Sequence, residues 1–248
     1  MPDTAHPPAG KPLSQIALLG LLLGLAAVAA LLAAGVGYRL GWWPLLPALR
    51  VAEWAAYGAA LGLLLSLAGG LQARPGGRRR GLSMAVVGLV ASLPVVVAAA
   101  QWKYGELVYP PINDISTDIE DPPVFWEMPN PTDYPGGETA TLQRAAYPDI
   151  APLTLAVAPP HAYALALGLV RDNGWEIVAD QPDEGRIEAV AASLLFGFKD
   201  EVAIRIAASD GGARVDLRSR SRLGRIDRGM NAKRIRAFGA ELRRRAGE

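Results

Sequence analysis

The chain has 248 residues, of which 51% are hydrophobic, and a formal net charge of +1. It contains no cysteine, which excludes disulfides and thiolate chemistry but indicates little about its compartment. Three long apolar runs fall before residue 101, and most of the charged residues follow it. We therefore expect a membrane half followed by a soluble half.

The amino-terminal half begins with residues 1–13, whose prolines and polar or small residues favour a disordered tail. Apolar runs then cover Gln15 to Gly37, Ala55 to Leu71 and Leu82 to Ala100. About 20 apolar residues cross a bilayer core, so each run predicts a transmembrane helix, with Pro94 as a kink in the third. A cleaved signal peptide is the alternative for the first run, but the apolar core of such a signal has only about 7–15 residues.

Charged loops and aromatic residues indicate the orientation of these helices. The loop between the second and third runs holds Arg74, Arg78, Arg79 and Arg80, and positively charged loops face the cytoplasm. Aromatic residues flank the opposite, outer ends, as in an interfacial belt: Tyr38, Trp42, Trp43, Trp54, Trp102 and Tyr104. We expect a multi-pass protein of the bacterial cytoplasmic (inner) membrane, with a membrane domain over 14–104, a cytoplasmic amino terminus and a periplasmic carboxy-terminal domain.

Small residues recur at four-residue spacing within the runs: Gly20 and Gly24, Gly58 and Gly62, Gly88 and Ser92. Such spacing lets helix backbones approach closely in lipid, either against another membrane protein or among these three helices themselves. No ionisable residue lies in the middle of a run, which argues against a transporter. The expected partners are membrane lipid and a membrane or periplasmic protein.

Residues 105–152 are rich in proline, which predicts an irregular, extended segment. This segment could bind a partner or act as a lid, or it could be a linker wrapped on the domain surface. Four aromatic residues favour wrapping: Phe125, Trp126, Tyr134 and Tyr147.

An α+β soluble domain is expected over residues 153–248. Its predicted elements are strands over 153–158, 175–180 and 186–192, a hairpin over 196–222, and helices over 160–173 and 228–245. The order β-α-β-β-β-β-α predicts an antiparallel sheet with its helices on one face. This order resembles the helix-grip or TATA-binding-protein-like class, a fold analogy that implies no function.

The hairpin from Phe196 to Arg222 is the most strongly specified element. Asp210-Gly211 suits a type I′ turn, and pairing outward from it places Arg205 opposite Asp216 and Glu201 opposite Arg220. Alternate residues form an apolar row: Val202, Ile204, Ile206, Val215 and Leu217. One face of the sheet is therefore expected to be buried and the other to carry charge.

Charge is divided within the soluble half. Residues 106–188 contain 15 acidic and 3 basic residues, a net −12, whereas residues 189–248 contain 7 acidic and 14 basic residues, a net +7. Mutual attraction between the two parts of one domain is a sufficient reason for this division. Nucleic acid is not expected as a partner, because an outward-facing domain has no access to it.

Two groups of motifs resemble one family. The first contains residues 112–118 (INDISTD), 121–123 (DPP) and 146–150 (AYPDI), and the second contains 196–202 (FGFKDEV) and 219–232 (SRSRLGRIDRGMNA). They resemble the uncharacterised family catalogued as domain of unknown function 1499, over about residues 110–245. That family has no assigned activity, so the resemblance implies no catalytic residue, and it does not extend to the membrane half.

These motifs supply the candidate ligand-binding residues: Asn113, Asp118, Phe196, Phe198, Lys199, Asp200, Arg218, Arg222, Arg225 and Asn231. The polar residues of 113–118 could bind a cation or ligand, or satisfy the backbone in an Asx turn. The phenylalanines could stack on a ligand or cap the core. The arginines suit an anion site or a solvated face, and because Arg205 and Arg220 have strand partners, the other three are expected to be freer. Asp227 is placed to cap the last helix, and Asn231 could bind a ligand or lie on the surface.

The sequence offers little enzyme chemistry. Its histidines are His6 and His161, and it shows neither a nucleophile-elbow motif nor the ligand spacing of a zinc site. Asp200 and Glu201 point to opposite faces of one strand, so they cannot form an acid–base pair. We assign no catalytic residue, metal or cofactor.

The leading expectation is a membrane-anchored, periplasm-facing binding or assembly module, such as an accessory subunit of a membrane complex. One alternative is a protein that binds an anionic small ligand or lipid headgroup through arginines. Another is a carboxylate-based hydrolase, in which Asp118 and Asp200 would meet in a deep pocket.

Overall fold

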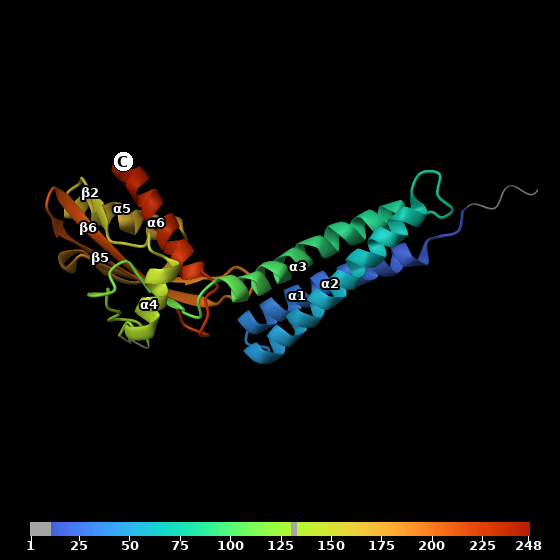
Figure 1. The fold of residues 1–248 in the computed structure, drawn as a ribbon, viewed down its shortest axis with the longest axis horizontal. Helices are drawn as coiled ribbons and strands as arrows, with labels where there is room; N and C mark the ends of the chain where they lie inside the picture. The colour runs from blue at the N-terminus through green and yellow to red at the C-terminus, as the bar shows by residue number, and fades with distance from the viewer. Residues whose placement is uncertain (1–10, 130–132) are drawn as a thin grey trace, which may run out of the picture. The chain divides into compact units, whose positions relative to one another are not determined.

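The computed structural model describes residues 11–129 and 133–248 (Figure 1). The chain divides into two compact units, Met1–Lys103 and Tyr104–Glu248. Most of the tail expected to be disordered, residues 1–10 with His6, lies outside the described residues. The end of that tail makes defined contacts, since Leu13 forms an isolated bridge with Arg80.

Three helices make up the first unit: α1 (Gln15–Arg39), α2 (Leu45–Ala73) and α3 (Leu82–Val108), of which the end of α3 from Tyr104 onward belongs to the second unit. All three are long and apolar enough to cross a membrane, as expected. Helix α2 begins ten residues before the predicted apolar run, because Pro44 at its N-cap starts the helix without losing a hydrogen bond. Pro94 lies inside α3.

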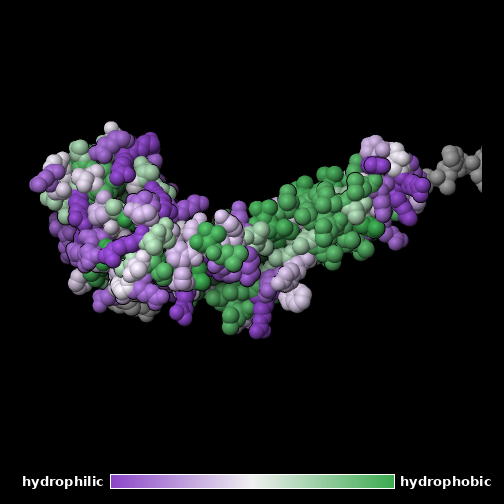
Figure 2. All heavy atoms as spheres, in the orientation of Figure 1, coloured by the Kyte–Doolittle hydropathy of each residue, from purple (hydrophilic) through white to green (hydrophobic). Residues whose placement is uncertain are grey.

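The interior of this unit holds small residues and its surface holds large apolar ones. A Cβ atom added to Gly20 would lie 2.6 Å from the backbone nitrogen of Ser66, and one added to Gly24 would lie 2.9 Å from the carbonyl oxygen of Gly88. The spaced small residues therefore pack among the three helices, except Gly58, which faces open space. The visible helix surface is hydrophobic along its length (Figure 2), as lipid requires.

The start of α1 and the basic α2–α3 loop lie at the same end of the unit. The Ser14 N–H donates to the carbonyl of Arg80 at 2.9 Å, and Arg79 Nη1 donates to the carbonyl of Leu13 at 3.2 Å. The Ser14 hydroxyl also donates to Gln72 Oε1 of α2 at 3.2 Å. The amino-terminal end of α1 and the arginine cluster must therefore face the same side of any membrane that the helices cross.

The second unit is an antiparallel sheet with helices, and this part of the fold prediction is confirmed. Its elements are β1 (Asp114–Ser116), α4 (Gly137–Ala146), β2 (Leu153–Leu155), α5 (Pro159–Asp172), β3 (Glu176–Gln181), a 3₁₀ turn (Pro182–Glu184), β4 (Arg186–Ala192), β5 (Lys199–Ser209), β6 (Gly212–Ser221) and α6 (Met230–Ala246). Strand β1 and helix α4 belong to the segment that was expected to be irregular. Helix α4 fits there because it lies between Pro135 and Pro148 and contains no proline itself.

The strand order is β1-β6-β5-β4-β3, and β2 also pairs with β6. The predicted hairpin register is confirmed: Ser209 lies opposite Gly212, Arg205 opposite Asp216 and Glu201 opposite Arg220. The free edge of β1 is covered by a side chain of α4. Gln143 accepts from the Ser116 N–H at 3.1 Å and donates to the Ser116 carbonyl at 2.6 Å, as a neighbouring strand would.

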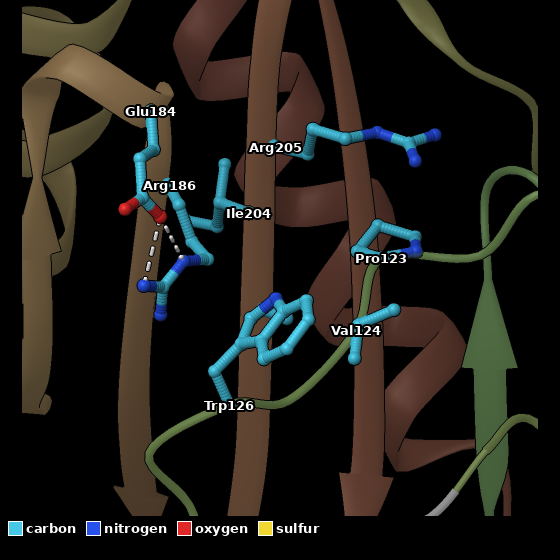
Figure 3. Close-up of a pocket in the computed structure, with 8 residues that line it drawn as sticks. Pro123, Val124, Trp126, Glu184, Arg186, Ile204 and Arg205 are labelled. Carbon is cyan, nitrogen blue, oxygen red and sulfur yellow. Dashed lines mark hydrogen bonds and ion pairs between the residues drawn. The ribbon is translucent and has the colours of Figure 1, made fainter.

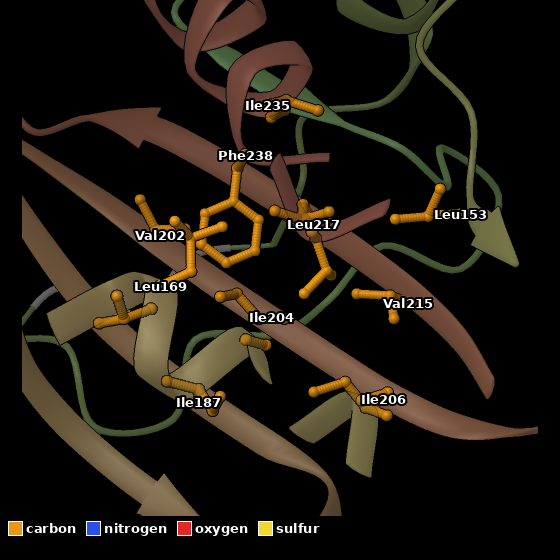
Figure 4. Packing of buried hydrophobic residues seen from close by; sticks show 14 of the residues in the cluster. Leu153, Leu169, Ile187, Val202, Ile204, Ile206, Val215, Leu217, Ile235 and Phe238 are labelled. Atoms are coloured by element: carbon orange, nitrogen blue, oxygen red, sulfur yellow. The ribbon is translucent and has the colours of Figure 1, made fainter. Parts of the chain in front are cut away.

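Helices α5 and α6 pack on one face of the sheet and enclose the main apolar core (Figure 4). The predicted apolar row of the hairpin lies in this core, where Ile204 and Leu217 are almost fully buried. Phe238 of α6 and Leu169 of α5 pack against the row from the helix side. Burying each such side chain contributes about 1.5–3 kcal/mol, so this face holds the helices on the sheet.

The opposite face of the sheet carries charge, as predicted, but this charge is not solvated. Glu188, Glu201, Asp216 and Arg218 are all at most 1% exposed. Residues 117–129, which we call the strap, cover this face. The sequence pattern predicted which residues point to this face and favoured wrapping of residues 105–152 on the domain. It did not predict that this segment would bury this face through contacts between residues 61 to 96 positions apart.

Candidate functional site

The strap is attached to the sheet through a buried carboxylate. Glu188 of β4 is fully buried and accepts hydrogen bonds from the backbone N–H groups of Trp126 at 2.9 Å and Glu127 at 3.1 Å. Its charge is balanced by Arg186, whose Nη1 lies 2.7 Å from Glu188 Oε1. Phe125 and Met128 complete the attachment, since both are buried against Val190 and Ala203.

Arg218 is the most deeply buried cation under the strap. It is 1% exposed and forms two parallel hydrogen bonds with Asp114 of β1, Nε to Oδ1 at 3.0 Å and Nη2 to Oδ2 at 2.7 Å. Its Nη1 donates to the carbonyl of Pro123 at 3.2 Å, and its guanidinium carbon lies 4.7 Å from the centre of the Phe125 ring. Arg218 thus joins β1, β6 and the strap.

A second buried carboxylate, Glu201, holds two arginines of β6 and the loop that follows. Arg220 forms an ion pair with Glu201 Oε2, and Arg222 Nε donates to Glu201 Oε1 at 2.9 Å. The expectation that Arg218 and Arg222 are freer than their neighbours is therefore wrong. Pairing of residues across the hairpin identified Glu201 as the partner of Arg220. It could not identify Asp114, which comes from β1, as the partner of Arg218, or show that Glu201 also binds Arg222. Arg225 is exposed.

The far end of this face carries the acidic start of the strap. Arg205 binds Asp216 and, at 2.8 Å, Asp121, while Arg214 binds Asp216 at 3.0 Å and Asp118 at 2.5 Å. Asp118 also accepts from the N–H groups of Glu120 and Asp121, so the Asx-turn interpretation is confirmed for Asp118. Burial alone would raise the pKa of Asp118, but these N–H groups and the charges of Arg214 and Arg205 outweigh it and hold that pKa below its usual value.

Every arginine of this face is paired with a carboxylate. The arginines are Arg186, Arg205, Arg214, Arg218, Arg220 and Arg222, and their carboxylate partners are Asp114, Asp118, Asp121, Glu184, Glu188, Glu201 and Asp216. Six cations thus meet seven anions. A buried charge is tolerated only when it is paired in this way, so the face is a structural network rather than an empty anion site.

A hollow of about 280 Å³ lies beside the strap, between it and strands β4 and β5 (Figure 3). Trp126 and Val124 of the strap line one side, and Arg186 and Arg205 line the other. Trp126 is 66% exposed and Val124 is 44% exposed, although the backbone between Pro123 and Glu127 is fixed to the sheet. The sequence indicated both Phe125 and Trp126 as apolar anchors. Phe125 is buried as expected, whereas Trp126 faces solvent.

The family model of a protein of unknown function, DUF1499, matches residues 114–242. The chain belongs to the DUF1499 family. The match confirms the resemblance seen in the sequence motifs. It begins at the buried partner of Arg218 and includes the strap, the whole sheet and most of α6. No curated protein and no solved structure was found to match the chain.

The DUF1499 motifs form a second polar cluster on the helix side of the sheet. Asn231 of α6 is fully buried, accepts from the Ser219 hydroxyl at 2.8 Å and donates to the carbonyl of Asn113 at 2.9 Å. The alternative that placed Asn231 on the surface is wrong. Arg234 joins this cluster to β5 through an ion pair with Asp200 at 2.6 Å. The motif residues here tie α6 to the sheet.

Asp227 does not occupy the N-cap position of α6, which is Gly229, but its carboxylate accepts backbone N–H groups at the helix start as expected. Its carboxylate accepts from the N–H groups of Gly229 at 2.8 Å and Asn231 at 2.7 Å. Burial raises the pKa of this carboxyl, and the two hydrogen bonds lower it by less. The cap satisfies backbone groups that would otherwise be unpaired inside the DUF1499 domain.

The remaining candidates lie apart from these clusters. Phe196 and Phe198 stack on each other with ring centres 5.1 Å apart, and Lys199 lies 3.9 Å from the carboxylate of Glu176. The ten candidate residues therefore do not line one pocket of the DUF1499 domain. Within the described part of the chain, no group of three or more His, Asp or Glu side chains is arranged to hold a metal ion.

The two carboxylates that a hydrolase would need are separated by the sheet. Asp118 binds Arg214 and Arg205 on the strap face, whereas Asp200 binds Arg234 of α6 on the helix face. Each carboxylate is already held by an arginine. The pairing required for acid–base catalysis is not formed by these two residues.

Proposed function

We propose that this chain is a membrane-anchored binding or assembly module whose DUF1499 domain presents a rigid surface to a protein partner. The observation that carries the proposal is the exposure of Trp126 beside the hollow. A tryptophan held at a fixed position with most of its surface in solvent is a typical anchor of a protein interface. The strap fixes it through buried hydrogen bonds and the Phe125 contact, so little ordering entropy would be lost on binding.

The chemistry of the hollow defines the partner surface that would fit. Its apolar wall of Trp126 and Val124 suits an apolar side chain, while Arg186 and Arg205 already hold carboxylates and add little free charge. An uncharged or weakly polar protein segment fits this lining better than a phosphate or carboxylate ligand. This favours the assembly role over the anionic-ligand alternative.

Photo-crosslinking from single positions tests this proposal. A photoreactive phenylalanine analogue at Trp126 is expected to capture a specific protein in intact cells. The matched control is the same analogue at Val178, which is 37% exposed on the edge strand β3. A specific product from position 126 alone supports the proposal. Equal or absent products at both positions, with normal amounts of the chain in the membrane, would reject it.

We also propose that the chain spans the bacterial cytoplasmic membrane three times, with the DUF1499 domain in the periplasm. The start of α1 and the arginine loop lie at the same end of the helices, which supports this proposal. The positive-inside rule assigns that end to the cytoplasm. The chain has no native cysteine, so single substitutions can report the side directly. Asp210→Cys should react with a membrane-impermeant maleimide added to intact spheroplasts, and Arg78→Cys should react only after the membrane is opened.

Neither remaining alternative is preferred. Binding of an anion by Arg218 and Arg222 would require displacing Asp114 and Glu201 from buried ion pairs. A hydrolase based on Asp118 and Asp200 would require two carboxylates that lie on opposite faces of the sheet. The helix-grip or TATA-binding-protein-like class remains our proposal for the relationship of the fold.

A further inference from the structure

The loop between β4 and β5 presents a leucine to solvent on a well-defined turn. Leu194 is 91% exposed. The turn is closed by hydrogen bonds from the Ser193 N–H to the Phe198 carbonyl at 2.9 Å and from the Gly197 N–H to the Ser193 carbonyl at 2.9 Å, with Gly197 at a φ of 66°. In the same loop, Phe196 and Phe198 stack on each other. A single exposed leucine is common on a protein surface, so a contact surface can be inferred only if other apolar side chains lie near it.

Apolar side chains from two further segments lie at the same end of the domain. The Arg222 N–H donates to the Lys199 carbonyl at 3.0 Å, which joins the β4–β5 loop to the loop after β6, where Leu223 is 50% exposed. The end of α3 adds Leu107, which is 85% exposed. Three separate segments thus place large apolar side chains in solvent at one end, which marks a contact surface.

An ion pair between the loop after β6 and the end of α3 indicates what this surface contacts. Arg228, in the loop after β6, forms an ion pair with Glu106 of α3 at 2.6 Å. Glu106 lies two residues beyond Tyr104, a helix rise of about 3 Å, and Tyr104 is expected in the aromatic belt at the lipid interface. The loop that carries Leu223 is therefore tied, at Arg228, to a residue two positions beyond Tyr104.

Two basic residues are exposed at this end. Lys199 is 48% exposed by its side chain and lies 3.9 Å from the carboxylate of Glu176, and Arg225 is exposed. Apolar tips flanked by basic residues suit a segment that rests in the headgroup region of a membrane.

We infer that this end of the domain rests in the lipid interface of the membrane that anchors the chain, with Leu194 inserted among the acyl chains next to the headgroups. The inference rests on the membrane location proposed above and adds a second, peripheral contact to it. Membrane contact at this end would leave the hollow beside Trp126 to a different partner, because the hollow is lined by β4, β5 and the strap rather than by these loops.

A site-specific fluorescent probe tests the inference. The full-length chain is labelled with an environment-sensitive nitrobenzoxadiazole maleimide at Leu194→Cys, which is unique because no native cysteine exists. The matched control is Asp210→Cys, in the β5–β6 turn at the other end of the same strand β5. Both variants are reconstituted in vesicles of phosphatidylcholine and phosphatidylglycerol, with and without nitroxide-labelled lipid.

The expected result is a blue-shifted emission at position 194 and its loss when nitroxide lipid is present, with neither effect at position 210. Leu223→Cys should behave like Leu194→Cys. Equal emission and equal quenching at 194 and 210 would overturn the inference. Extraction of the vesicles with alkaline carbonate separates the two proposals: release of the chain contradicts the membrane anchor, whereas a retained chain with an unquenched 194 probe contradicts only the inserted loop.

Discussion

Arg218 and Asp114 are separated by 104 residues in sequence, yet they form two parallel hydrogen bonds of 3.0 and 2.7 Å in the interior of the domain. Both side chains are almost fully removed from solvent. The desolvation cost of two such charges is large, and a paired geometry is what makes their burial tolerable. This pair fixes the first strand of the domain to β6 and gives the strap its starting position.

Removing one member of this pair should destabilise the domain strongly. Arg218→Met leaves Asp114 buried without its cation, which costs about 3–5 kcal/mol for a pair of this kind. The measurement is thermal unfolding of the full chain in detergent, followed by near-ultraviolet circular dichroism. Arg243→Met, at an exposed position of α6, is the control and should leave the midpoint almost unchanged. A double variant, Arg218→Met with Asp114→Leu, should recover much of the loss, and failure to do so would contradict the pairing argument.

Glu188→Gln should loosen the strap without unfolding the sheet. The glutamine amide offers one acceptor oxygen where the carboxylate offers two, and its NH₂ group would face a backbone N–H of Trp126 or Glu127. We expect faster hydrogen exchange in residues 117–129 and unchanged exchange in β5 and β6. Glu184→Gln is the control, because Glu184 binds the same Arg186 from an exposed position. Uniform exchange changes across the domain would show that Glu188 supports the whole fold rather than the strap.

Asp118 should contribute stability that depends on pH. Its pKa in the folded chain lies below its value in the unfolded chain, so its contribution is present above about pH 4 and is lost as pH falls through the folded pKa. Asp118→Asn should therefore lower stability at neutral pH and reduce the acid dependence below about pH 4. Urea unfolding at a series of pH values measures both effects. Asp210→Asn, in the exposed hairpin turn, is the comparison, and identical acid profiles for the two variants would rule out this role.

The packing of the apolar helices leads to a contrast between two glycines. Gly20→Leu should separate α1 from α2, because even a Cβ atom there would lie 2.6 Å from the Ser66 backbone nitrogen. Gly58→Leu should be tolerated, because that position faces open space. Proteolysis of the chain in detergent reports the difference. If Gly58→Leu instead lowers the amount of a co-purified partner, the surface around Gly58 contacts another membrane protein.

Much of the fold could be predicted because it depends on local patterns. Hydrophobic length indicated three apolar helices, and the Asp210-Gly211 turn with its alternating apolar residues specified the hairpin register residue by residue. Such features involve residues near one another in sequence, so each short window contains its own evidence. The two hairpin ion pairs followed from the register in the same way.

The candidate site could be predicted only in part, because its partners come from distant segments. The sequence showed an acidic stretch and a basic stretch, and hence that the two would attract. It did not show that Arg218 meets Asp114, that Glu201 holds both Arg220 and Arg222, or that Phe125 is buried while Trp126 is exposed. Proline spacing also concealed α4 and β1, because prolines mark where elements end and do not exclude short elements between them.

By itself the sequence determined where the apolar helices lie, how the central hairpin pairs, and which family the soluble domain belongs to. Only the tertiary structure decided which face the strap covers and which arginines beneath it form ion pairs. The physical reason is that a charged residue on a strand is compatible with either solvent or a buried partner. The choice depends on whether another segment supplies a carboxylate, a carbonyl and an aromatic ring at the same place, as Asp114, Pro123 and Phe125 do around Arg218.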